Sequence, residues 1–337
     1  MRVTGYPIRP GWLALVEEDV LDPARPIVDA PHHLWNRPTI RYLLPDLLED
    51  MASGHNIVAT VYLEASEAYR EAGPEHLRSV GETQFATTIA DAGGSARAQV
   101  CAAIVSHVDL AQPPHIVEEA LSAHRAAGGA RFKGVRGHAA WDPSGLGFGS
   151  RPQVRGLLLS AEFRAGFARL ARHGLSYDAW QYHTQLGELT DLARAFPETT
   201  IIVNHLGAPL GAGPYAGRRD EVFRDWRQGI RGLAACPNVS MKLGGMGTTL
   251  AALGFDGRQL PPTSDEIASA MTPYVDTCIE AFGAGRCMFE SNFPPDKQSF
   301  SYPVLWNAYK KLARHASEVE KDALFSGTAA RVYRLAA

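Results

Sequence analysis

The chain has 337 residues, of which 45% are apolar and 20% charged, so it can bury a large core and is not expected to be disordered. A formal net charge of -3 and a pI near 6.5 lack the basic excess that nucleic-acid binding needs. No apolar run reaches the roughly 18 residues of a membrane span, and acidic residues soon after Val16 break any signal-peptide core. We therefore expect a cytoplasmic protein with a small-molecule substrate and no nucleic-acid or membrane partner; the sequence leaves open whether it forms a homo-oligomer.

After a lead segment of residues 1–25, short β-branched apolar segments alternate with longer stretches of helical periodicity. The expected strands are, in chain order, Pro26–His33, Asn56–Ala65, Ala98–Ser106, Arg131–Arg136, Leu175–Tyr182, Thr200–His205, Val239–Gly244 and Cys287–Asn292. The expected helices include His115–Ala127, Ala161–His173, Leu186–Phe196, Asp220–Cys236, Ser264–Phe282 and Ser317–Arg334. This repeated alternation predicts the α/β class and a (β/α)₈ TIM barrel that forms a single domain over residues 26–337. A doubly wound open sheet is the alternative, but no G-x-G-x-x-G follows the first strand.

Three long segments rich in Gly or Pro interrupt this rhythm. They follow expected strands and span Gly137–Val154, Gly207–Arg219 and Gly244–Thr263. Long irregular loops after barrel strands usually cover an active site. The four cysteines are scattered without a C-x-x-C pair, which predicts buried, reduced thiols.

Polar side chains gather at the C-terminal ends of the expected strands, where the catalytic groups of such barrels lie. They are Asp29 and His33, Arg136 and His138, Tyr182 and His183, His205, and Glu290 and Asn292. A single histidine is more often structural than catalytic. Several histidines at matching strand ends indicate a site.

The motifs VDAPHHLW, FKGVR, YHTQLGELTDLARAFPETTIIVNHLG, VSMKLGG and FESNFP, in this order, resemble the TIM-barrel metal-dependent hydrolases of the amidohydrolase superfamily. The similarity spans Pro26–Leu335 and points to the branch with sugar lactonases and 2-pyrone-4,6-dicarboxylate lactonase. The resemblance implies His-x-His on strand 1, a His on each of strands 5 and 6, and a metal-binding, water-activating Asp on strand 8. These positions fall on Pro31 and His33, on His183 and His205, and on Asn292.

Two of these positions depart from the family pattern and bear on the metal. Proline has no donor atom, and the neutral amide of Asn292 is a poor ligand that cannot act as a carboxylate base. His33, His183 and His205 could still form a three-nitrogen site for a divalent metal such as Zn²⁺. The pyrone-dicarboxylate lactonases are understood to work without a metal, and we expect that no cofactor is required here.

Without a carboxylate at position 292, another base is needed. Side chains alternate along a strand, so Glu290 shares the inward face of Asn292, one layer deeper, where burial and a bonded histidine would suit general-base work. The alternative is a Glu that pairs with Arg or Lys and orders the barrel floor. Asp29 shares the face of His33, and we expect it to orient a histidine.

Arg136 is expected to bind a carboxylate of the substrate through its planar guanidinium. The alternative is a salt bridge across the barrel mouth. The other expected substrate-binding residues are His138, Tyr182 and Asn292, and weaker candidates are Lys242, Asp296 and Lys297.

Together these residues predict a lactonase-like hydrolase that opens a lactone, or a related small cyclic carbonyl compound, by direct attack of water. His205 and His33 would polarise the carbonyl group, and His183 or Glu290 would deprotonate the water. The sequence has no G-x-S-x-G motif, so a serine nucleophile is not expected. Two alternatives remain: a decarboxylase of the superfamily acting on an unsaturated or aromatic acid, and a catalytically inactive barrel with a binding role.

Overall fold

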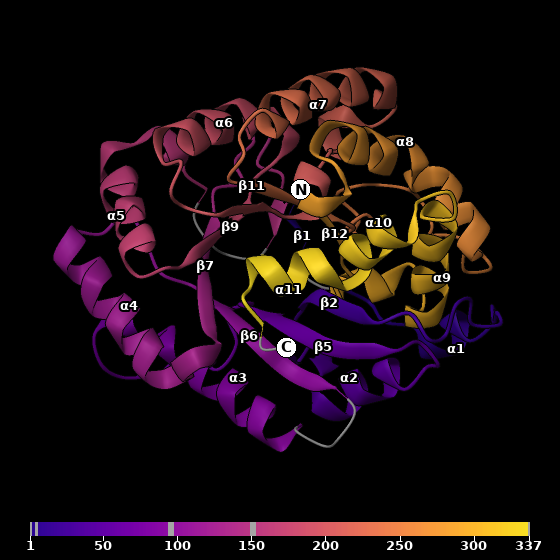
Figure 1. The fold of residues 1–337 in the computed structure, drawn as a ribbon, viewed down its shortest axis with the longest axis horizontal. Coiled ribbons are helices and arrows are strands. Elements are labelled where there is room, and N and C mark those ends of the chain that lie inside the picture. The colour runs from indigo at the N-terminus through magenta and orange to yellow at the C-terminus, as the bar shows by residue number, and fades with distance from the viewer. Residues whose placement is uncertain (1, 4–5, 94–97, 149–152, 336–337) are drawn as a thin grey trace.

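Eight parallel strands form one sheet in the computed structural model, which describes residues 2–3, 6–93, 98–148 and 153–335 (Figure 1). In chain order the strands are β2 (Ile27–His32), β5 (Ile57–Leu63), β6 (Gln99–Ser106), β7 (Phe132–His138), β9 (Ser176–Trp180), β10 (Ile201–Val203), β11 (Val239–Leu243) and β12 (Cys287–Phe289). Each pairs with the next in the chain. All eight predicted strands are confirmed.

The first and last strands meet just beyond their C-terminal ends. The backbone N–H of His33 donates to Phe293 O at 2.7 Å, and the N–H of Asn292 donates to Pro31 O at 3.1 Å. The sheet therefore closes on itself, and the predicted TIM barrel is confirmed. This junction also brings the motifs around His33 and Asn292, which are far apart in sequence, into direct contact.

Helices surround the barrel (Figure 1). They are α2 (Leu44–Met51), α3 (Val80–Ala92), α4 (Pro114–Gly128), α5 (Ala161–Arg172), α6 (Leu186–Ala195), α7 (Arg219–Ala234), α8 (Ser264–Phe282) and α9 (Tyr302–Leu312). The predicted helix Ser317–Arg334 is instead divided into α10 (Glu318–Asp322), a π-helical turn (Ala323–Gly327) and α11 (Thr328–Val332). Within the described residues no helix is long and apolar enough to cross a bilayer. The four cysteines are buried and free, as predicted.

One end of the barrel is closed by α11. Tyr333, which follows this helix, packs on buried barrel residues such as Val61 and Met288, and its hydroxyl donates to Asp178 at 2.8 Å. Asp178 also accepts from Lys242 at 2.7 Å, and both side chains are fully buried. Lys242, a weak candidate in the sequence, thus lies in the barrel floor.

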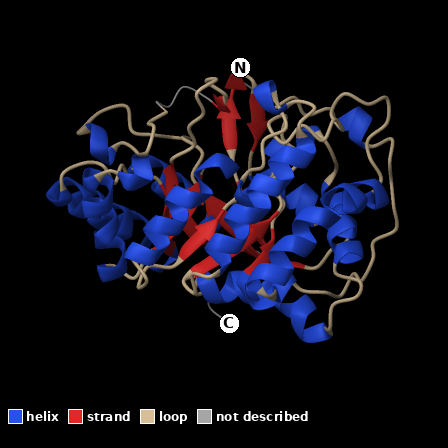
Figure 2. Ribbon diagram, turned by 90° about the horizontal axis from the view of Figure 1, so that it is seen from above, coloured by secondary structure: helices blue, strands red, loops and turns tan. Residues whose placement is uncertain are grey.

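The opposite end carries the long loops. The short strand β1 (Arg2–Val3) pairs with β8 (Gly147–Phe148) from the loop after β7, and this ribbon rises beside the N-terminus, far from the C-terminus (Figure 2). The three predicted loops pack together there, through Leu146, Leu210 and Leu250 around Tyr182. Residues 149–152 of the predicted loop Gly137–Val154 lie outside the described residues. Smaller elements at this end and nearby are α1 (Pro10–Leu13), β3 (Trp35–Arg37) and β4 (Ile40–Tyr42).

Candidate active site

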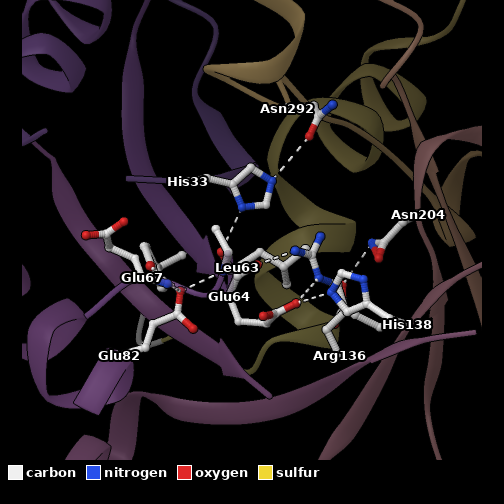
Figure 3. Close-up of polar contacts among 12 residues, drawn as sticks. His33, Leu63, Glu64, Glu67, Glu82, Arg136, His138, Asn204 and Asn292 are labelled. Carbon is white, nitrogen blue, oxygen red and sulfur yellow. Dashed lines mark hydrogen bonds and ion pairs between the residues drawn. The ribbon is translucent and has the colours of Figure 1, made fainter. Parts of the chain in front are cut away.

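His33 follows β2 directly, and one of its ring nitrogens is held by the backbone (Figure 3). Its Nδ1 lies 2.8 Å from Leu63 O, and because a carbonyl oxygen can only accept, Nδ1 carries the proton. Burial and then the charge of Arg136 lower the pKa of His33 well below its ordinary value, so the ring is neutral. Its Nε2 is therefore an acceptor. Trp35 stacks on the ring, with 5.7 Å between centroids, and Tyr6 stacks on Trp35 at 5.3 Å.

His205 follows β10 and contacts Glu290, which follows β12. Its Nδ1 lies 2.7 Å from Glu290 Oε1, and the same oxygen accepts the backbone N–H of His205 at 3.1 Å. Burial raises the pKa of Glu290 to about 8, and burial lowers the pKa of His205 well below its ordinary value. The ring of Trp180 meets the imidazole edge-on, with 5.0 Å between centroids. Glu290 thus occupies the deep, histidine-bonded position expected from the sequence.

Two glycines after β11 make room for this pair. A Cβ on Gly245 would lie 2.4 Å from Cβ of His205, and a Cβ on Gly244 would lie 2.4 Å from Cγ of Glu290. Gly245 also has a φ of 71°, in the left-handed region that favours glycine. The motif VSMKLGG ends in two glycines because both site residues pack directly on this backbone.

Arg136 in β7 is bound by a carboxylate that the sequence reasoning missed (Figure 3). Its Nε donates to Glu64 Oε1 at 2.8 Å, its Nη2 donates to Glu64 O, and His138 Nε2 contacts the same Oε1. Arg136 and Glu64 are both buried. This contact is the salt bridge that stood as the alternative to carboxylate binding. Glu64 comes directly after β5, so the strand-end rule that selected the other residues could have found it.

Asn292 faces His33 across the junction between the first and last strands (Figure 3). Its Oδ1 lies 3.3 Å from His33 Nε2, and its Nδ2 donates to Asp296 Oδ1 at 2.8 Å. The other oxygen of Asp296 accepts the backbone N–H of Gly247 at 2.9 Å. Burial raises the pKa of Asp296 well above its ordinary value, whereas these two donors act in the opposite direction. The φ of 52° at Asn292 is one that asparagine tolerates better than most residues.

His183 lies apart from this group. Its Nδ1 accepts the backbone N–H of Leu210 at 3.3 Å, and its ring meets Tyr215 edge-on. No hydrogen bond or ring contact joins it to His33 or His205 in the described part of the chain. Among the described residues, no three His, Cys, Asp or Glu side chains come together in a way that could hold a metal ion. The predicted three-histidine ligand set is therefore not assembled.

The expectation for Asp29 needs correction, whereas substrate binding by Tyr182 stays a prediction. Asp29 does not orient a histidine, because its oxygens accept from the N–H and hydroxyl of Ser291 and from the hydroxyl of Tyr302. It instead fixes the segment after β12 against β2. Tyr182 donates its hydroxyl to Leu146 O at 3.3 Å, so it holds the loops together.

The closed barrel and its strand-end histidines agree with the family comparison, in which residues 28–335 match the model of the amidohydrolase family. The chain belongs to the amidohydrolase family. The superfamily and the hydrolase activity expected from the sequence are thereby confirmed.

Two sequence relatives and two crystal structures illustrate the similarity. The protein y4mH of Sinorhizobium fredii is 34% identical over 295 residues, which cover 87% of this chain and 86% of y4mH. An L-fucono-1,5-lactonase of Burkholderia multivorans is 31% identical over 183 residues, 54% of this chain and 59% of the lactonase. A crystal structure of a Burkholderia multivorans amidohydrolase with bound HEPES, 25% identical, has a TM-score of 0.72 and covers 92% of this chain and 99% of that one. A second crystal form of a Burkholderia multivorans amidohydrolase contains zinc.

Proposed function

We propose that this amidohydrolase opens a lactone by direct attack of water. The observation that carries the proposal is the His205–Glu290 pair, in which the carboxyl group lies against Nδ1 while Nε2 makes no hydrogen bond within the described residues. A histidine supported in this way at one nitrogen can act as a base at the other. Support comes also from the similarity to L-fucono-1,5-lactonases.

In the proposed first step, His205 Nε2 takes a proton from water while the water oxygen attacks the lactone carbonyl carbon. The Glu290 carboxylate accepts the Nδ1–H of His205 and stabilises the imidazolium that forms. Glu290 lies beneath the imidazole and acts through it. This assignment differs from the sequence-based expectation, in which Glu290 or His183 deprotonates the water directly and His205 polarises the carbonyl group.

The charge of Arg136 lowers the pKa of both His33 and His205, whereas Lys242, which lowers the pKa of His205 more strongly, is paired with Asp178 in the barrel floor. We assign to Arg136 the role of donating a hydrogen bond to the lactone carbonyl oxygen, which becomes negative as water adds. A fixed donor at this oxygen stabilises the transition state. The intermediate then collapses: the ring C–O bond breaks, and the leaving alkoxide takes the proton from the His205 imidazolium. The product is an open-chain hydroxy acid.

The Nε–Nη2 edge of Arg136 is already bonded to Glu64 and its charge is paired with that carboxylate, so only the remaining N–H groups are left for a substrate. For this reason we favour an uncharged lactone with several hydroxyl oxygens over one that carries a carboxylate.

The side chains do not fit the metal centre implied by the resemblance. Pro31 offers no side-chain donor, Asn292 is neutral, and its Nδ2 is bonded to Asp296. The charge of Arg136 lowers the pKa of His33 and of His205, and for the same electrostatic reason it disfavours a divalent cation beside these two imidazoles. We therefore propose hydrolysis that needs no bound metal, and no step above involves one.

A screen of lactones with a pH indicator tests the proposal, run with and without chelator and paired with metal analysis. Substituting His205→Ala should lower kcat/KM by about 10²- to 10⁴-fold, the usual effect of losing a general base. The matched control is His173→Ala, at a histidine on the barrel exterior that contacts Glu118. Loss of activity together with stoichiometric zinc would overturn the metal-free route. Release of CO₂ without ring opening would favour a decarboxylase, and no turnover of any lactone would favour a binding role.

A further inference from the structure

Two hydrogen-bond acceptors face each other at the barrel mouth without a hydrogen between them. The Nδ1–H of His33 donates to Leu63 O, so the lone pair of the imidazole ring lies on Nε2. Asn292 presents Oδ1 to the same nitrogen at 3.3 Å. Buried acceptors are normally satisfied, and His33 and Asn292 are 3% and 2% exposed. The two acceptors can therefore bind the hydroxyl group of another molecule, which donates its O–H to them.

The orientation of the Asn292 amide depends on Asp296. Both oxygens of Asp296 lie opposite N–H groups, the N–H of Gly247 and the Nδ2–H of Asn292, so this side chain holds the amide rotamer in which Nδ2 points to Asp296 and Oδ1 points to His33. Asp296 is itself fixed, since its second oxygen accepts the N–H of Gly247 and its own N–H donates to Asn292 O at 3.1 Å. Gly247 must lack a side chain, because a Cβ there would lie 2.8 Å from Cβ of Asp296.

We propose that Asp296 is a positioning residue, which holds the Asn292 amide so that its Oδ1 and His33 Nε2 together accept the O–H of a substrate hydroxyl group. This inference rests on the proposed lactone hydrolysis for the identity of the substrate, but the geometry of the acceptor pair can be tested without turnover. Asp296 does not touch the substrate; it acts through Asn292.

The substitution Asp296→Asn keeps the shape of the side chain, but it presents an N–H donor to Asn292 where Asp296 presents an acceptor. The N–H of Gly247 requires an oxygen opposite it, so the new amide must turn its NH₂ group toward Asn292. Asn292 then rotates to offer Oδ1 to position 296 and Nδ2 to His33. One acceptor of the pair becomes a donor, while packing is retained.

The matched control is Asp50→Asn. Asp50 is also a buried carboxylate, but it is bonded to Lys297 and the Tyr42 hydroxyl. Both variants are compared with the natural protein by thermal unfolding, so that a loss of fold is recognised.

The direct readout is the ¹⁵N resonance of the His33 ring in histidine-labelled protein, assigned with His33→Gln. We expect Nε2 to move upfield in Asp296→Asn, because it now accepts from Asn292, and to stay unchanged in Asp50→Asn. An unchanged Nε2 resonance in a folded Asp296→Asn protein would overturn the inference. This result does not depend on whether lactones are hydrolysed.

The functional readout is selectivity between L-fucono-1,5-lactone and unsubstituted δ-valerolactone. Asp296→Asn should lower the ratio of their kcat/KM values by about tenfold, the effect of one hydrogen bond to a hydroxyl group, mainly through KM. Asp50→Asn should leave the ratio unchanged. Equal losses on both lactones would show that Asp296 has only a structural role. If neither lactone is hydrolysed by the natural protein, the proposed function fails and the resonance alone decides the position of the amide.

Discussion

The protonation state of Glu290 controls how strong a base His205 can be. Burial raises the pKa of this carboxyl group to about 8, so near neutral pH much of it is protonated and carries no charge to stabilise an imidazolium. Only the ionised form supports proton transfer from water. We therefore expect kcat/KM to rise with pH and to level off above about 8.

The substitution Glu290→Gln should remove this rise and lower the plateau by about 10²-fold or more. Glutamine keeps an oxygen for the two hydrogen bonds from His205 but has no ionisable group. Initial rates from about pH 6 to 9 on an accepted lactone, corrected for spontaneous hydrolysis, measure both effects. A variant that keeps the same inflection near pH 8 would show that another group titrates.

The loops after the strands determine the positions of the site residues more than the strands do. His205 and Asn292 both have positive φ, 55° and 52°, and each begins the turn that leaves its strand. Such conformations are unfavourable for residues other than glycine and are maintained only when the surroundings fix them. Gly245, in the loop after β11, packs against His205 and helps to fix its conformation.

The substitution Gly245→Ala should therefore abolish most activity. The new Cβ would lie 2.4 Å from Cβ of His205, which must move away from Glu290. The control is Gly254→Ala, in the same loop: its φ of 77° imposes a similar backbone cost, but no atom lies within 4 Å of the new Cβ. Thermal unfolding should show that both variants fold and that Gly245→Ala is the less stable, because only its new Cβ meets another residue, whereas the kcat/KM of Gly254→Ala should stay near that of the natural protein. Comparable activity of the two variants would contradict the role assigned to this contact.

The strands could be predicted from the sequence because alternation and β-branched content are local properties, and eight of them imply a closed barrel. The expected contact of Glu290 with a histidine is found at His205, although Glu290 and Asn292 lie beyond the last residue of β12 and are not related by strand alternation. The hydrogen-bond partners of the site residues could not be predicted, because they depend on which side chains meet once the barrel has closed. Asp29 bonds to Ser291 instead of a histidine, and Arg136 bonds to Glu64. Helix Ser317–Arg334 was predicted as continuous because its periodicity continues through the π-helical turn that directs α11 under the barrel.

The two ends of the barrel differ in the charged groups that they bury. The floor is closed by α11 and neutralised by the buried Lys242–Asp178 pair, while the mouth concentrates carboxyl groups whose pKa values are raised. Burying such groups costs stability when they ionise, because the unfolded chain solvates the charge better. The mouth therefore makes the stability of the entire domain depend on pH.

Glu82 of α3 gives a measurable part of this dependence without touching the site. Its Oε1 accepts from the hydroxyl of Tyr62 and from the N–H groups of Ala65 and Glu67, and burial raises its pKa from 4.5 to about 7. A raised pKa means that the folded state holds the proton more tightly. The stability contribution is full below about pH 4.5 and is lost as the pH rises through about 7, a loss on the order of 3 kcal/mol.

The substitution Glu82→Gln should remove this loss, because a neutral amide keeps an oxygen for all three donors. Urea unfolding at about pH 5, 6 and 7.5 should show a smaller decline in the free energy of unfolding than in the natural protein. Some decline should remain, since burial also raises the pKa of Asp29 to about 6 and that of Glu290 to about 8. The control Glu198→Gln changes an exposed glutamate and should leave the decline as it is. If Glu82→Gln declines as steeply as the natural protein, Glu82 is ionised in the folded state throughout this range, and the pH dependence arises from the residues at the barrel mouth alone.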